Sequence, residues 1–273
     1  MKPMKKIALL HSMCSVGKAS LTNMIPILST MGMEACPIPT MLLSTHTGGF
    51  GAPATCHVEA EYIRSCADHY RENGVSFDVI FVGYLGSADM VSAVQYFLDS
   101  FPDASVVLDP ILGDHGTYYR NLGPEYIHAF RKLIPYADVV LPNLTEACLL
   151  TDTSYAEDLS KEQIAQICQA LQKAGAKNVI ITSVPAAKEQ VGIALSMGTQ
   201  TDFFALPKEK EDFHGSGDLF DAVLMGSLWN GSSIEDSIRK AHDFVCACIK
   251  ESGQYDYPKR EGLLIEKNLS LLV

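Results

Sequence analysis

The segment Phe77-Asp78-Val79-Ile80-Phe81-Val82-Gly83-Tyr84 is an apolar run of strand length with the composition of a buried β-strand. Residues 88–101 follow it with the length of a helix, and Ser105-Val106-Val107-Leu108-Asp109 is a second apolar run, which ends in an acid. A strand, a helix and another strand in this order are typical of two parallel strands joined by a crossover helix. This part of the sequence therefore predicts an α/β fold.

The same alternation of short apolar runs and helix-length segments continues on both sides. We predict a three-layer α/β/α fold, with a mainly parallel central sheet, helices on both faces, and a small glycine-rich flap at residues 44–51. No linker or internal repeat is evident, so residues 1–273 are expected to form a single domain. The expected strands are residues 7–11, 35–39, 77–84, 105–109, 138–141 and 178–182, with a hairpin at 191–196 and 201–206, and the expected helices are residues 21–31, 58–73, 88–101, 124–134, 143–150, 161–174, 219–229 and 234–250.

The composition is that of an ordinary soluble globular protein, with 47% hydrophobic and 19% charged residues. The net charge of -11 and the lack of a basic block argue against nucleic acid as a partner, although a local dipole or metal still permits binding of a nucleotide. The apolar run at residues 7–10 stops at His11, and no apolar stretch is long enough to cross a membrane. Eight scattered cysteines without a Cys-x-x-Cys pair predict reduced thiols and a cytoplasmic location.

A glycine-containing loop, His214-Gly215-Ser216-Gly217-Asp218, leads directly into the expected helix at residues 219–229. The glycines allow a tight turn, and the unpaired N–H groups and positive dipole end of a helix start favour an anion such as phosphate. Asp218 has two interpretations, either as a cap of the helix or as a general base beside a phosphate site. The loop alone does not decide between them.

Polar residues stand at the ends of several expected strands. Ligands of open α/β sheets bind beyond the carboxyl ends of the strands, so we expect these residues to lie at one edge of the sheet. They are His11-Ser12, Gly83-Tyr84, Asp109, Asn143 and Thr182-Ser183.

Two sets of acids at strand ends are candidates for a metal site. The first set is Asp109 and Asp114, which are either solvated turn residues or carboxylates that hold Mg²⁺ beside nucleotide phosphates. In the second, Asn143 and Glu146 are spaced to share a helical turn, either as a capping box or with Glu146 as a further metal carboxylate.

Together these motifs resemble the ribokinase-like superfamily of small-molecule kinases and, within it, the pyridoxal (vitamin B6) kinases. Gly215-Ser216-Gly217-Asp218 is similar to the Gly-Thr-Gly-Asp motif of the superfamily, and Asn143 to Glu146 fits its Asn-x-x-Glu motif. Segments similar to those of pyridoxal kinases occur in the same order, namely Ser12, His46-Thr47-Gly48, Gly83-Tyr84-Leu85-Gly86-Ser87 and Asp109-Pro110 through Gly113-Asp114.

The resemblance implies an ATP-dependent kinase that phosphorylates the 5′-hydroxymethyl group of pyridoxal, pyridoxine or pyridoxamine. It implies that Asp218 is the base, that Gly215, Ser216 and Gly217 hold the γ-phosphoryl group, and that the protein is a homodimer. The remaining roles that it implies are ATP binding by Asp109, Asn143, Glu146, Thr182 and Ser183, Mg²⁺ binding by Asp114 and Glu146, and substrate binding by Ser12, His46, Thr47 and Tyr84.

The sequence departs from the family pattern at several positions. Ser216 replaces the usual Thr, Gly49-Phe50 replaces a Tyr often found in the flap, and Leu141 replaces a Thr near a monovalent cation, which leaves the need for such an ion open. Two alternatives stay open. One is a hydroxymethylpyrimidine kinase of thiamine synthesis, in which Cys often stands at the position of Asp218, and the other is an inactive vitamin-binding module.

Overall fold

The protein is described here by a computed structural model that covers residues 4–119 and 122–273. The chain divides into two compact units. The first unit combines Met1–Val58 with Glu209–Val273, and the second is the continuous segment Glu59–Lys208. The single-domain count stays a prediction, and each unit is described by itself.

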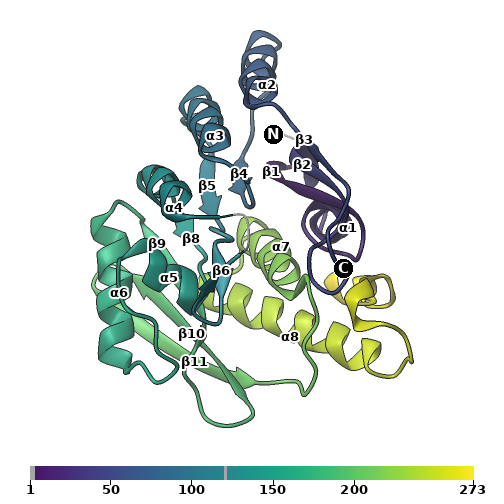
Figure 1. Ribbon diagram of the computed structural model, residues 1–273, viewed down its shortest axis with the longest axis vertical. Helices are drawn as coiled ribbons and strands as arrows, with labels where there is room; N and C mark the ends of the chain where they lie inside the picture. The colour runs from purple at the N-terminus through teal and green to yellow at the C-terminus, as the bar shows by residue number, and fades with distance from the viewer. Residues whose placement is uncertain (1–3, 120–121) are drawn as a thin grey trace. The chain divides into compact units, whose positions relative to one another are not determined.

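The sheet of the first unit contains strands β1 (Lys6–Val16), β2 (Glu34–Thr45) and β3 (Thr55–His57) (Figure 1). β1 and β2 are parallel, and β3 runs antiparallel to β2. β1 and β2 are both longer than predicted. The first half of β1 is buried on both faces, whereas its second half alternates between exposed and buried residues. A strand predicted from a continuous apolar run therefore ends before β1 does.

Over its described residues, 4–58 and 209–273, the first unit contains the α-helices α1 (Leu21–Thr30), α7 (Ser216–Trp229) and α8 (Ile234–Ser252). α7 packs against both α1 and α8 (Figure 1). It buries every residue from Leu219 to Ser227, most of them apolar, as expected for a helix in the middle of a core. Three short 3₁₀ helices, η2 (Lys259–Glu261), η3 (Ile265–Lys267) and η4 (Leu269–Leu272), complete the unit.

The second unit has a sheet in the order β11-β10-β9-β8-β5-β4. Strands β4, β5, β8 and β9 are parallel, whereas β10 and β11 form the predicted antiparallel hairpin. The strands are β4 (Val79–Val82), β5 (Ser105–Leu108), β8 (Val139–Val140), β9 (Asn178–Val184), β10 (Gln190–Met197) and β11 (Gln200–Pro207), with a separate pair β6 (Gly113–Asp114) and β7 (Thr117–Tyr118).

The helices of the second unit form two groups. α2, α3 and α4 pack against one another in that order, while α5 and α6 pack against each other and on β9. The expected helix at 124–134 changes after residue 130 into a 3₁₀ helix, η1, because Pro135 lacks the N–H that an α-helix needs. The helices are α2 (Ala60–Glu72), α3 (Ala88–Ser100), α4 (Pro124–Phe130), η1 (Arg131–Tyr136), α5 (Leu144–Leu150) and α6 (Lys161–Lys173).

The predicted α/β class with a mainly parallel sheet is confirmed, but the positions at the strand ends are only partly right. Asp109 follows β5 directly, and Tyr84 and Asn143 come shortly after β4 and β8. His11-Ser12 and Thr182-Ser183, in contrast, lie inside β1 and β9, because both strands extend past their apolar cores.

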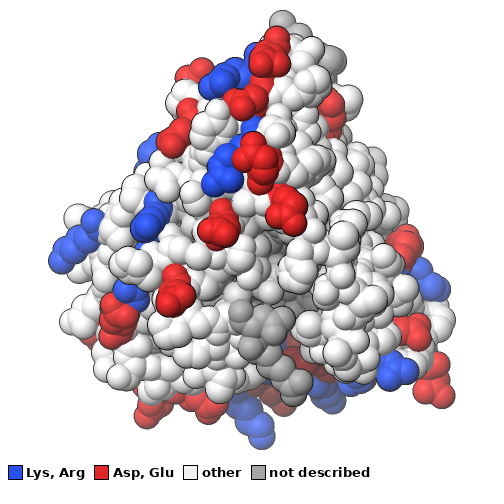
Figure 2. Space-filling model, turned by 45° about the horizontal axis from the view of Figure 1, so that its top comes forward, with Lys and Arg blue, Asp and Glu red and all other residues white. Residues whose placement is uncertain are grey.

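The surface shows acidic and basic side chains scattered among one another over the face drawn in Figure 2. The eight cysteines are free thiols. Over residues 4–119 and 122–273, no helix has the length and apolar composition that spanning a membrane requires.

Candidate active site

The start of α7 is an open array of backbone donors. Gly215 caps the helix in the left-handed conformation, with φ 82°, and its carbonyl accepts from the N–H of Leu219 at 3.2 Å. Among the described residues, no acceptor faces the N–H groups of Ser216 and Gly217. A Cβ atom added at Gly217 would meet nothing within 4 Å, so space is open beside these donors. Free donors at the positive end of a helix dipole suit an anionic ligand.

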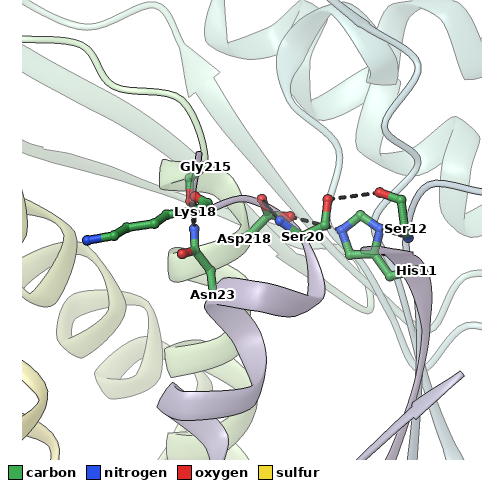
Figure 3. Close-up of polar contacts among 7 residues, drawn as sticks. All are labelled: His11, Ser12, Lys18, Ser20, Asn23, Gly215 and Asp218. Atoms are coloured by element: carbon green, nitrogen blue, oxygen red, sulfur yellow. Dashed lines mark hydrogen bonds and ion pairs between the residues drawn. The ribbon is translucent and has the colours of Figure 1, made fainter. Parts of the chain in front are cut away.

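Asp218 lies in the first turn of α7 but does not cap it, since the helix has no side-chain cap. One carboxylate oxygen, Oδ1, is 3.0 Å from Nε2 of His11, and the other, Oδ2, accepts from the backbone N–H of Ser20 at 2.7 Å (Figure 3). The side chain of His11 is 1% exposed and that of Asp218 is 12% exposed. The capping interpretation of Asp218 is therefore wrong, and the carboxylate is instead held in place by groups from β1 and from the start of α1.

The turn between β1 and α1 delivers the N–H of Ser20 to Asp218. Gly17, Lys18 and Ser20 all have positive φ, and Ser20 adopts φ 59° and ψ -138°, a conformation that costs a non-glycine residue about 1–3 kcal/mol. The buried hydroxyl groups of Ser12 and Ser20 are 2.9 Å apart. Ser12, a predicted substrate residue, is thus connected to the same turn.

Next to this turn, the predicted flap is held by the C-terminal segment. Nδ1 of His46 accepts from the N–H of Gly48 at 3.0 Å, so its Nε2 carries the proton and donates to the carbonyl of Arg260 at 2.7 Å. Burial lowers the pKa of His46, reinforced by His214, while the hydrogen bond to Arg260 and the charge of Asp218 oppose the shift.

The guanidinium of Arg260 also lies 5.2 Å from the centre of the Phe50 ring. Thr47, in contrast, is exposed. Both ring nitrogens of His46 are engaged with the backbone, and the rings of Phe50 and His214 pack beside it at centroid distances of 5.1 and 4.8 Å.

In the second unit, Asn143 and Glu146 form a capping box at the start of α5, which is one of the two interpretations that their spacing allowed. The two carboxylate oxygens of Glu146 accept from the N–H groups of Leu112 and Asn143, both at 2.9 Å, and Nδ2 of Asn143 donates to the carbonyl of Gly113 at 2.8 Å. Burial, followed by the negative charge of Asp109, raises the pKa of Glu146, against the effect of these N–H groups. The loop after β5 is thereby fastened to the start of α5.

The other predicted residues of this unit lie in two settings. Asn143 and Thr182 form a parallel bridge, and Asp109 lies close enough to Glu146 to affect its pKa. Asp114 and Ser183 are exposed, and burial raises the pKa of the half-buried Tyr84. Over the described parts of the chain, no three His, Cys, Asp or Glu side chains are grouped as a metal cluster. Mg²⁺ commonly uses one or two carboxylates together with substrate phosphates; of the two predicted ligands, Glu146 is buried near Asp109, whereas Asp114 is exposed.

Three residues make contacts in the site without belonging to a motif, namely His11, Ser20 and Arg260, and of these only His11 was among the polar residues expected at the strand ends. Ser20 and Arg260 act through a backbone N–H and a carbonyl, which carry no sequence signal. A usable signal exists only for His11, which is a polar residue inside an apolar strand next to a motif residue.

Comparison with known proteins places the chain among small-molecule kinases. A hydroxymethylpyrimidine/phosphomethylpyrimidine kinase of Haemophilus influenzae is 33% identical over 173 residues, which cover 62% of this chain and 63% of that protein, less than two thirds of its length. A pyridoxal kinase of Corynebacterium diphtheriae is 28% identical over 256 residues, which cover 88% of this chain and 86% of that protein.

Solved structures match over almost the whole chain. A protein of Bacteroides thetaiotaomicron, named as a candidate phosphomethylpyrimidine kinase, superposes with a TM-score of 0.93 at 36% identity and covers 98% of this chain and 94% of its own. A second crystal form of that protein contains pyridoxal. Pyridoxal kinase of Lactobacillus plantarum superposes with a TM-score of 0.91 at 29% identity, covering 98% and 96% of the two chains.

These matches confirm the ribokinase-like α/β/α fold and the relationship to a family of kinases, and they include relatives named for each of two substrates. The family model of the phosphomethylpyrimidine kinases matches residues 25–261, which is most of the sequence. The chain therefore belongs to the phosphomethylpyrimidine kinase family.

Proposed function

We propose that this kinase transfers a phosphoryl group from ATP to the 5′-hydroxymethyl group of vitamin B6 compounds. The observation that carries the proposal is at the start of α7, where the fixed carboxylate of Asp218 stands in the same helical turn as the free N–H groups of Ser216 and Gly217. A base and an anion site next to each other are what phosphoryl transfer to a hydroxyl requires.

In this proposal, Asp218 accepts the proton of the substrate hydroxyl as the oxygen attacks the γ-phosphorus. The backbone N–H groups of Gly215, Ser216 and Gly217 stabilise the negative charge on the transferred group. Such donors cost no reorganisation during the reaction because the fold has already placed them.

The acceptors of the second unit suit Mg-ATP. The residues proposed to contact the nucleotide are Asp109, Asn143, Glu146, Thr182 and Ser183. Glu146 and Asp114 are proposed to bind Mg²⁺, an ion that proteins usually hold partly through water molecules. Bound Mg²⁺ supplies positive charge to the phosphate oxygens. Glu146 fits this role because it is buried and the nearby charge of Asp109 helps to raise its pKa. A bound cation would relieve the repulsion between these two carboxylates.

A vitamin B6 compound is favoured as the substrate by the Bacteroides relative, which was solved with pyridoxal and is 36% identical over 98% of this chain. Ser12, His46, Thr47 and Tyr84 are proposed to line the pyridine site. The flap residues would contribute through Thr47 and the ring of His46, since both nitrogens of that ring are taken.

Hydroxymethylpyrimidine is the second candidate substrate, and the relative from Haemophilus influenzae is the observation in its favour. A coupled assay of ADP release with Mg-ATP decides between them, run with pyridoxal, pyridoxine, pyridoxamine and hydroxymethylpyrimidine. We expect turnover of at least one vitamin B6 compound. Turnover of the pyrimidine alone would move the protein to the second candidate, and ATP binding without any turnover would support a vitamin-binding module.

A homodimer in the cytoplasm also remains part of the proposal, and light scattering during size-exclusion chromatography measures the oligomeric state directly. Repeating the kinase assay with Na⁺ or K⁺ as the only monovalent cation tests the ion dependence that Leu141 leaves open.

A further inference from the structure

The buried ring of His11 makes one hydrogen bond that fixes its protonation pattern. The backbone N–H of Ser12 donates to Nδ1 of His11 at 2.8 Å. A nitrogen that accepts a hydrogen bond carries a lone pair, so the proton of the neutral ring is on Nε2. This Nε2–H therefore donates to Oδ1 of Asp218 at 3.0 Å.

A local irregularity of β1 explains this arrangement. The parallel register between β1 and β2 shifts between His11 and Ser12, so that His11 pairs with Pro39 and Ser12 with Met41. Such bulges redirect side chains next to functional sites. Both His11 and Ser12 are buried, at the end of the stretch of β1 that is buried on both faces.

We propose that His11 is a positioning residue for Asp218, and this inference rests on the proposed role of Asp218 as the base. The His11 Nε2–H and the Ser20 N–H bind one carboxylate oxygen each, so rotation of the carboxylate breaks at least one bond (Figure 3). The role is to hold the carboxylate in one orientation toward the reacting hydroxyl. Misplacement of a catalytic group by about 1 Å can cost about 100-fold in rate.

Two isosteric substitutions separate the two nitrogens of the ring. In His11→Gln, the side-chain amide nitrogen replaces Nε2 and still donates to Asp218, while the bond from Ser12 is lost. In His11→Asn, the amide oxygen replaces Nδ1 and still accepts from Ser12, while the bond to Asp218 is lost. Each variant loses one of the two hydrogen bonds, so they are matched in the damage that they cause.

We expect His11→Asn to lower kcat about 10- to 100-fold, with KM values for ATP and the hydroxyl substrate within about threefold of the wild type. His11→Gln should recover most of that loss. In an Asp218→Asn background, His11→Asn should cause no further loss, because residues that act as one unit are not additive. Equal kcat losses in the two variants, following equal drops in melting temperature, would show that the ring serves only packing and would overturn the proposal.

An NMR measurement tests the contact without any substrate. Long-range ¹H–¹⁵N correlation spectra report which ring nitrogen of each of the eight histidines is protonated, and comparison with His11→Asn identifies the signals of His11. We expect the Nε2–H form at neutral pH. A proton on Nδ1 overturns the proposal even in an active enzyme. The Nε2–H form in a protein that phosphorylates none of the tested compounds would support the His11–Asp218 contact while rejecting the proposed function.

Discussion

Replacing Gly215 by Ala tests whether the turn before α7 depends on a glycine. Gly215 has φ 82°, a conformation that costs an L-residue about 1–2 kcal/mol. The new Cβ would lie 2.3 Å from the carbonyl oxygen of Lys18 and 2.7 Å from Nδ2 of Asn23, and relieving such overpacking costs about 1–3 kcal/mol. The lower entropy of the unfolded Ala chain offsets about 0.4–1 kcal/mol of this cost.

The free energy of unfolding should therefore fall by about 1–5 kcal/mol, which corresponds to a melting temperature about 2–20 °C lower for a chain of this size. Gly217→Ala is the matched control two residues away, since its Cβ would meet nothing within 4 Å and its φ is not positive. Differential scanning fluorimetry and urea titration measure both variants.

The two variants should separate stability from activity. Gly217→Ala should melt within about 2 °C of the wild type, because Ala is the better helix former. It should still lose kinase activity, because its methyl group occupies the open space beside the donors. A Gly215→Ala protein that melts like the wild type, or a Gly217→Ala protein that is equally destabilised, would refute the account of this turn.

Three further predictions concern single side chains. Asp218→Asn should keep the affinity for ATP but lower kcat by about 10²- to 10⁴-fold, and near-normal turnover would remove Asp218 as the base. The free energy of unfolding should fall as the pH drops from about 7 to 5, because His46 has a lowered pKa in the folded protein and takes up its proton more readily in the unfolded chain. Urea titrations of His46→Gln should show a weaker dependence of stability on pH, and an unchanged dependence would contradict this prediction. Asn143→Ala should lower the free energy of unfolding by about 0.5–2 kcal/mol and remove most of the kinase activity. Ser160→Ala, at the exposed capping box of α6, should lower stability by a similar amount and leave the activity unchanged. Urea titration and the ADP-release assay measure the two effects, and equal activities of the two variants would show that Asn143 is not part of the site.

Local signals were sufficient for most of the fold. Apolar runs and helical periodicity located the elements, and the hairpin of β10 and β11 emerged with nearly its observed bounds. The errors arose where burial changes along an element. β1 runs on to Val16 with one face exposed, and the helix after Pro124 tightens before Pro135.

The site was predictable only where it is formed by side chains whose type and spacing are visible in the sequence. The Asn143–Glu146 box follows from residue type and spacing, and the structure shows it. The partners of Asp218 do not follow from residue type and spacing, because His11 and Ser20 are distant from Asp218 in sequence and Ser20 contributes only its backbone N–H. The sequence also left the capping role of Asp218 open, since the first turn of a helix favours an acid for either purpose.

The discontinuity of the first unit sets the order in which the nascent chain can mature. Asp218 is 207 residues beyond His11, so at about 5–20 residues per second the ribosome produces it roughly 10–40 s later. The second unit is complete by Lys208 and is free to fold during that interval. The apolar residues of Ile7–Leu10, fully buried in the finished protein, are therefore synthesised long before the last helices of their own unit, and transiently exposed apolar segments of this kind are prone to aggregation during folding.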